Sequence, residues 1–116
     1  YRDQARKLKP HITEPEMVMP ITAHAAFHKA CKYFDIKPVY VPLKDNFEVD
    51  LKQFAAAITP NTILLVASAP QYPHGIVDPV EDIALLAKKH NLGLHVDSCI
   101  GGFVLPFAKK RTFVRV

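Results

Sequence analysis

Residues 62–67, TILLVA, decide the fold of this chain. The stretch is apolar at both odd and even positions, so neither face of a strand built from it would suit water. This pattern is typical of a strand buried on both faces, as in a parallel sheet covered by helices on each side. Thr59-Pro60 comes before it and a proline-containing segment follows, which confines the strand to this stretch.

Amphipathic stretches and short apolar runs alternate outward from this strand. The apolar residues Ala23, Ala26, Phe27, Ala30 and Phe34 recur at helical spacing over residues 23–34. The expected helices cover residues 1–9, 23–34, 51–58 and 79–90, and the expected strands cover 16–19, 39–41, 62–67 and 92–96. The alternation predicts an α/β domain with a mostly parallel sheet and flanking helices.

Two acidic residues mark expected helix starts. Asp50 is predicted to be an N-cap, and Gln53 three residues later completes a pair that resembles a capping box. Asp78 is predicted to cap the next helix, with Pro79 at the first helical position.

Length and composition indicate one folded domain at most. The chain has 116 residues, of which 49% are hydrophobic and 22% charged, and its mean hydropathy is +0.04. These values are typical of a folded chain rather than a disordered one. The longest apolar runs fall far short of the ~18 residues that a spanning helix needs, and the charged start shows no signal peptide. Because the chain does not open with Met, we expect a fragment whose start lies upstream.

The net charge of +4 does not predict nucleic-acid binding. Residues 1–9 hold four basic and one acidic side chain, and residues 109–116 hold four basic and none acidic. Residues 10–108 hold seven basic and ten acidic side chains, a balance of −3. Phosphate binding needs clustered positive charge on one surface, which this distribution does not predict. The two cysteines, Cys31 and Cys99, are expected to be reduced thiols.

Polar and reactive side chains gather where three of the four expected strands end. In open α/β sheets, ligands bind outside the carboxyl ends of the strands. The candidates there are Thr22, His24, Ser68, Gln71, Tyr72, His74, Gly75, His95, Asp97, Ser98, Cys99, Gly101 and Gly102.

Asp97 follows an apolar strand and is therefore expected to be partly buried. It is either a cap for the next segment or a counter-ion to a bound cation, such as a metal or a protonated pyridine nitrogen. His24 is either structural or a flat ring that stacks on a planar ligand. Prolines and Gly75 make the loop 69–75 rigid, which suits a loop that presents His74 to a ligand and equally one that only turns.

Metal binding is the weaker interpretation of these residues. His24 and His28 form an HxxxH pair without the glutamate of a zinc protease motif. His95, Asp97 and Cys99 alternate and would point to one side, but no fourth ligand has the expected spacing. We therefore expect no metal site.

Three motifs in order resemble one known family. ITAHAAFHKAC (21–31), TILLVASAPQYPHGIVDPV (62–80) and LGLHVDSCIGGF (92–103) look like the sphingosine-1-phosphate lyase family. That family is pyridoxal-phosphate-dependent and group II decarboxylase-like, with the fold-type-I large domain. The resemblance covers residues 1–110, which we expect to be a fragment of that domain, with 111–116 as a divergent tail.

The resemblance implies roles for several residues. His24 matches the residue that stacks on the pyridine ring, and Asp97 matches the acid that pairs with the protonated pyridine nitrogen. Ser68 and His74 match cofactor-facing positions. Gly75, Cys99 and Gly101 match residues that line the cofactor and substrate region, where Gly102 also falls.

The resemblance also implies an activity. The family cleaves phosphorylated sphingoid bases to a fatty aldehyde and ethanolamine phosphate, as a homodimer at the endoplasmic reticulum membrane. The Schiff-base lysine of the family and its phosphate-binding loop are not in these 116 residues. We therefore expect the chain alone to be inactive. We also expect it to be marginally stable, because missing neighbouring strands and a missing dimer partner would leave apolar edges uncovered, and cytoplasmic, because these residues hold no membrane anchor. The alternatives are a fragment of a pyridoxal-phosphate-dependent amino-acid decarboxylase, a non-catalytic decoy or interaction fragment, and a product without function.

Overall fold

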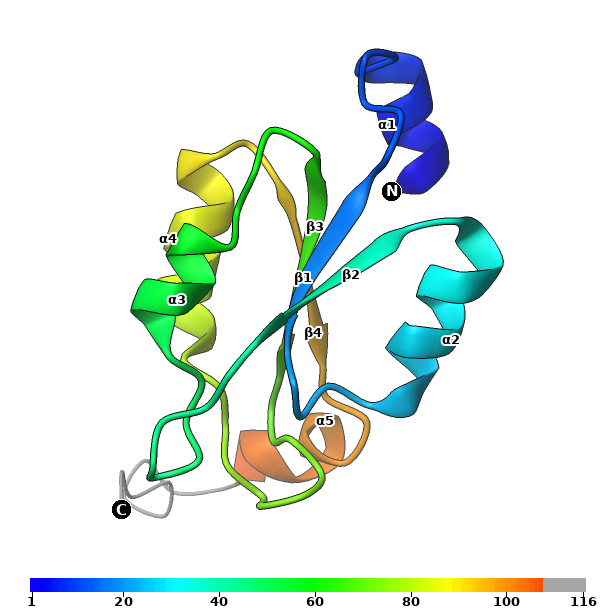
Figure 1. The fold of residues 1–116 in the computed structure, drawn as a ribbon. Coiled ribbons are helices and arrows are strands. Elements are labelled where there is room, and N and C mark those ends of the chain that lie inside the picture. Colours follow the sequence, from blue (N-terminus) through cyan, green and yellow to red (C-terminus); the bar gives the residue numbers. More distant parts are fainter. Residues whose placement is uncertain (108–116) are drawn as a thin grey trace.

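The computed structural model describes residues 1–107, so the predicted tail at 111–116 lies outside the described residues. The helices and strands alternate as expected, and the central sheet is parallel throughout (Figure 1). In chain order the elements are α1 (Arg2–Leu8), β1 (Glu16–Pro20), α2 (Ala25–Phe34), β2 (Lys37–Val41), α3 (Leu51–Ala56), β3 (Thr62–Ser68), α4 (Val80–Lys89), β4 (Gly93–Asp97), α5 (Gly101–Val104) and the 3₁₀ turn η1 (Leu105–Phe107).

The strand order in the sheet is β2-β1-β3-β4. Every residue of the two inner strands, β1 and β3, is buried, whereas the edge strands β2 and β4 are largely half-buried or exposed. The stretch 62–67 is therefore a strand buried on both faces, as its sequence predicts. Its apolar residues on both faces reflect a helical layer on each side.

Alternate residues of the inner strands belong to two hydrophobic cores, one on each face of the sheet. Leu64 and Val66 of β3 face the α2 side, where Cys31 packs against them. Leu65 and Ala67 face the opposite side, where α3 and α4 cover the sheet. Figure 1 shows the same layers, with α2 on one face and α3 and α4 together on the other.

The helix starts agree with the sequence at one position and differ at another. The carboxylate of Asp50 accepts hydrogen bonds from the backbone N–H groups of Lys52 (2.9 Å) and Gln53 (3.2 Å), so the predicted N-cap is confirmed. The prediction for Asp78 was wrong, because α4 begins at Val80 and has no side-chain cap. The Asp78 carboxylate instead turns toward β3 and binds the backbone of Ser68.

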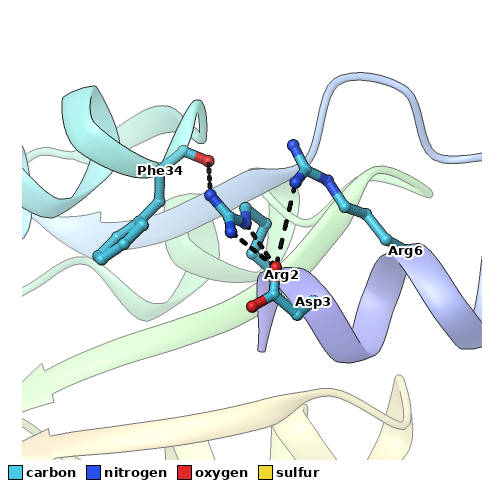
Figure 2. A network of polar contacts seen from close by, with 4 residues as sticks. All are labelled: Arg2, Asp3, Arg6 and Phe34. Carbon is cyan, nitrogen blue, oxygen red and sulfur yellow. Dashed lines mark hydrogen bonds and ion pairs between the residues drawn. The ribbon is translucent and has the colours of Figure 1, made fainter.

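Helix α1 is attached to the end of α2 by a small polar network (Figure 2). The Arg2 guanidinium binds the Asp3 carboxylate at 2.7 Å and donates to the carbonyl oxygen of Phe34 at 3.4 Å. It also lies over the Phe34 ring, 5.2 Å from the centroid. Arg6 approaches the same carboxylate at 4.0 Å. None of the helices within residues 1–107 combines the length and apolar character needed to cross a bilayer.

Candidate functional site

A cavity of about 600 Å³ opens at the carboxyl edge of the sheet. It lies where β1, β3 and β4 end, which is the place that the parallel topology favours for ligands. Its lining is Thr22, His24, Ala26, Phe27, Ser68, Pro70, Gln71, Tyr72, Gly75, His95, Asp97, Cys99 and Ile100. Of the seven residues to which the resemblance assigned the cofactor or substrate region, five are in this set, and His74 and Gly101 are not.

His24 stands at the start of α2 and serves as its N-cap. Its Nδ1 atom accepts a hydrogen bond of 3.2 Å from the backbone N–H of Ala26. A neutral imidazole that accepts at Nδ1 carries its proton on Nε2, so this bond selects the tautomer and restrains the ring. Because the side chain is exposed on the cavity side of α2, its ring remains accessible to a ligand.

Asp97 is the last residue of β4 and is half-buried. Its backbone is fixed by the sheet, since it pairs with Ser68 and its carbonyl accepts a bond of 2.8 Å from the N–H of Ala69. The Oδ1 atom accepts from the N–H of Cys99 at 3.2 Å. No lysine, arginine or histidine of residues 1–107 forms an ion pair with it. The bond from Cys99 is the contact that a cap would make, and a half-buried carboxylate without a cation also fits the counter-ion interpretation.

Ser68 reaches the cavity from the end of β3, the neighbour of β4. Its own backbone is held by Asp78, which lies ten residues later. Directly after it, the carbonyl oxygen of Ala69 accepts a hydrogen bond of 2.9 Å from the Ser98 hydroxyl. These bonds fix Ser68 and Asp97 side by side in the cavity wall.

Gly101 supports the wall rather than lining it. A Cβ atom placed on Gly101 would lie 1.7 Å from the carbonyl oxygen of Ala69. The start of α5 therefore packs directly on the backbone between β3 and the loop that follows. Only glycine permits so close an approach.

The loop after β3 is organised by Gln71, which is 1% exposed. Its Oε1 atom accepts from the backbone N–H of His74 at 2.8 Å, and its Nε2 atom lies 3.0 Å from Nδ1 of the same histidine. The His74 ring stacks on Phe47, with centroids 4.3 Å apart and 13° between the planes. His74 therefore braces the loop, whereas Gly75, at a φ of +69°, lines the cavity.

Thr22 contributes a buried hydroxyl to the cavity wall. Thr22 is 8% exposed, and its Oγ1 atom has no hydrogen-bond partner among residues 1–107. A buried hydroxyl without a partner is costly unless a ligand or water satisfies it. The sequence placed Thr22 and Gln71 in the right loops but gave no reason to rank them above their neighbours.

Phe27 and His95 also line the cavity; His95 was among the candidates at the strand ends, whereas Phe27 was expected only on the core face of its helix. Their rings lie 5.5 Å apart between centroids, with 57° between the planes. Helical spacing placed Phe27 on the core face of α2, and it does pack partly against that core. His95 alternates with Asp97 and Cys99, and all three line the cavity, which bears out their expected common side.

The HxxxH pair does not form a common site. The Nδ1 atom of His28 lies 2.7 Å from the Tyr40 hydroxyl, and the two rings stack with centroids 5.0 Å apart. His24 is instead engaged as the cap of α2. Within residues 1–107, no group of three or more His, Cys, Asp or Glu side chains has an arrangement that could hold a metal ion.

Comparisons with known proteins agree on one group of enzymes. The profile of the aminotransferase class I and II family matches residues 5–115. Sphingosine-1-phosphate lyase 1 of Mus musculus is 51% identical over 95% of this chain and 19% of its own length. The sphingosine-1-phosphate lyase of Oryza sativa subsp. japonica is 50% identical over 94% of this chain and 20% of its own.

A solved structure extends this similarity to the fold. The sphingosine-1-phosphate lyase of Burkholderia pseudomallei K96243 superposes with a TM-score of 0.87 at 37% identity, over 92% of this chain and 24% of that one. The chain therefore spans about a fifth of the length of the curated relatives it matches.

Proposed function

Since the chain belongs to the aminotransferase class I and II family and is homologous to sphingosine-1-phosphate lyases, we propose that it forms part of the cofactor site of such a lyase. Residues 1–110 are then part of the large domain that binds pyridoxal 5′-phosphate. The whole protein would cleave phosphorylated sphingoid bases to a fatty aldehyde and ethanolamine phosphate.

One observation carries the proposal: Asp97 and His24 line the same cavity although 73 positions separate them in the chain. The resemblance assigns them to the pyridine nitrogen and the ring face of the cofactor. If the packed protein interior separated the two side chains, they could not contact the same cofactor ring and the assignment would fail. The fold instead brings them together at one edge of the sheet.

The residues present fit the cofactor. The Asp97 carboxylate has no cation of its own within residues 1–107, and a protonated pyridine nitrogen would supply one. The unpartnered Thr22 hydroxyl offers a hydrogen bond to a polar group of the cofactor or substrate. The apolar side chains of Phe27 and Ile100 complete a wall suited to a flat aromatic ring.

The chemistry that pyridoxal phosphate supplies when bound is an electron sink for the pair released as the Cα–Cβ bond breaks. The Asp97 carboxylate would hold the proton on the pyridine nitrogen, because a negative charge nearby favours the protonated form. The imidazole of His24 would restrain the ring in its plane. The Ser68 hydroxyl, fixed by the sheet, would donate to or accept from an oxygen of the cofactor.

The test measures cleavage and cofactor binding together in the whole protein. Asp97→Asn is expected to lower turnover of a phosphorylated sphingoid base about 100-fold, because the amide cannot stabilise the protonated nitrogen. Asp82→Asn, an exposed change of the same charge on α4, is the matched control. Equal turnover in the two variants would contradict the proposal.

Product analysis separates the alternatives. Release of CO₂ from an amino acid, without fatty aldehyde from the sphingoid base, would support the decarboxylase instead. A chain that co-purifies with a full-length subunit but binds no pyridoxal phosphate would support an interaction fragment.

We extend the proposal to assembly and location on the family resemblance alone. The whole protein is proposed to be a homodimer at the endoplasmic reticulum membrane. Light scattering of the purified protein tests the first statement, and cell fractionation tests the second.

A further inference from the structure

Asp78 is a buried acid whose hydrogen bonds close a loop at the cavity. Its Oδ2 atom accepts from the backbone N–H of Ser68 at 2.7 Å, and its own N–H donates to the carbonyl of Ser68 at 2.9 Å. These two bonds join the ends of the loop 69–77. The residues that this loop supplies to the cavity are Pro70, Gln71, Tyr72 and Gly75.

The clamp between Asp78 and Ser68 continues into the rest of the site. Ser68 pairs with Asp97 in the sheet, and the next residue, Ala69, donates to the Asp97 carbonyl at 2.8 Å. The position of the Asp78 carboxyl group is therefore coupled through backbone bonds to Asp97.

Burying the Asp78 side chain costs free energy of folding. The residue is 2% exposed, and its Oδ1 atom has no hydrogen-bond partner among residues 1–107. Burial raises the pKa of this carboxyl group to about 6, against the lowering effect of the Ser68 bond. It does not cap α4, which begins without a side-chain cap. A role in holding the loop would explain why a costly side chain stands here.

We propose that Asp78 is a positioning residue of the candidate site, which clamps the base of the loop 69–77 against Ser68 and thereby sets where Gln71, Tyr72 and Gly75 lie in the cavity. This inference rests on the proposed function, because the cavity is taken as the binding site of pyridoxal phosphate. Asp78 itself does not line that cavity, so it acts through the backbone of Ser68.

The experiment compares variants of the whole protein by titration with pyridoxal 5′-phosphate. Asp78→Ala removes the acceptor and is expected to raise the dissociation constant about ten-fold or more. Asp78→Asn keeps an oxygen that can accept from Ser68 and is expected to stay within about three-fold of the parent protein. Asp82→Asn, on the exposed face of α4, is expected to bind as the parent does.

Hydrogen exchange supplies a readout that does not depend on the cofactor. Amides of residues 68–78 are expected to exchange about ten-fold faster in Asp78→Ala and at the parent rate in Asp78→Asn. A residue that only stabilises the fold would change exchange throughout the sheet instead. Should Asp78→Ala not fold, Asp78→Glu replaces it, because the longer side chain keeps the charge but displaces the acceptor.

Three outcomes would overturn the inference. The first is a folded Asp78→Ala, or Asp78→Glu in its place, that binds pyridoxal phosphate as tightly as the parent. The second is an Asp78→Asn variant that binds as weakly as Asp78→Ala. The third is a parent protein that does not bind pyridoxal phosphate, which would refute the proposed function as well, whereas the first two outcomes leave that function standing.

Discussion

Replacing Gly101 by alanine is expected to destabilise the protein strongly, whereas the same change at Gly102 is expected to stabilise it slightly. The new Cβ atom at position 101 would lie 1.7 Å from the carbonyl oxygen of Ala69 and 2.9 Å from Cδ1 of Leu105. At position 102 it would meet nothing within 4 Å. The two neighbours therefore differ in the space available and not in residue type.

The magnitude follows from what can move. A carbon and an oxygen without a bond between them need about 3.3 Å, so Gly101 and Ala69 would have to separate by roughly 1.5 Å. The Leu105 side chain can rotate away, but Ala69 is held by its bonds to Asp97 at 2.8 Å and Ser98 at 2.9 Å. Overpacking of this kind costs about 1–3 kcal/mol, and each hydrogen bond lost adds about 1 kcal/mol. We expect a loss of about 3 kcal/mol.

The gain at Gly102 comes from the unfolded chain. Alanine is better than glycine inside a helix by about 0.5–1 kcal/mol, because glycine loses more conformational freedom on folding. Thermal and urea unfolding of the two variants should therefore move in opposite directions, with Gly101→Ala melting ~10 °C below the parent. A Gly101→Ala variant within about 2 °C of the parent, or two variants that shift alike, would refute the close packing of α5 on Ala69.

Three further predictions concern other parts of the molecule. The pKa of the Asp78 carboxyl group is raised from 3.8 to about 6 in the folded protein, so the protonated form stabilises the fold below about pH 4. This stabilisation is lost as the pH rises through about 6. The free energy of unfolding in urea should therefore fall by about 3 kcal/mol less over that range in Asp78→Asn than in the parent. Arg2→Ala should speed hydrogen exchange in α1 several-fold, because it removes the contacts with Phe34, while Arg6→Ala should leave exchange nearly unchanged. His24→Ser should keep the cap of α2, and so the melting temperature, yet weaken pyridoxal phosphate binding, whereas His24→Ala should lose about 1 kcal/mol of stability as well; equal melting temperatures of these two variants would contradict the capping role.

The sequence predicted the parts of the fold that depend on local patterns. The run at 62–67 identified the buried central strand, and Asp50 identified the start of α3, because both signals lie within a few residues of the feature they mark. Helix α5 was not predicted, since its first two residues are glycines with low helix propensity. Its position comes from packing on Ala69, which no local pattern encodes.

The site was predictable as a set of loops but not as a set of roles. The carboxyl-edge rule selected the loops that hold Asp97 and His24, and both line the cavity. The roles of Asp78 and His74 depend on partners that lie ten or more positions away in the chain. The Asp78 carboxylate accepts from the N–H of Ser68, earlier in the chain, instead of capping α4. The His74 ring stacks on Phe47, which lies in the loop after β2. Both partners are set by the tertiary fold.

How each cavity residue is held in place predicts whether its substitution changes ligand binding alone or stability as well. Asp97 and Ser68 are fixed by the sheet ladder, so a change of side chain there should alter the chemistry while the backbone stays in place. His24 is held by its own side-chain bond, so a substitution that removes the cap, such as His24→Ala, changes the stability of α2 and the accessible ring together. The loop 69–77 depends on a carboxyl group outside the cavity, at Asp78. Alanine at either Asp97 or Asp78 is therefore expected to weaken binding while the sheet stays intact. The asparagine variant should retain binding only at Asp78, because the backbone N–H of Ser68 needs only an acceptor. At Asp97 a cationic ring would need the negative charge.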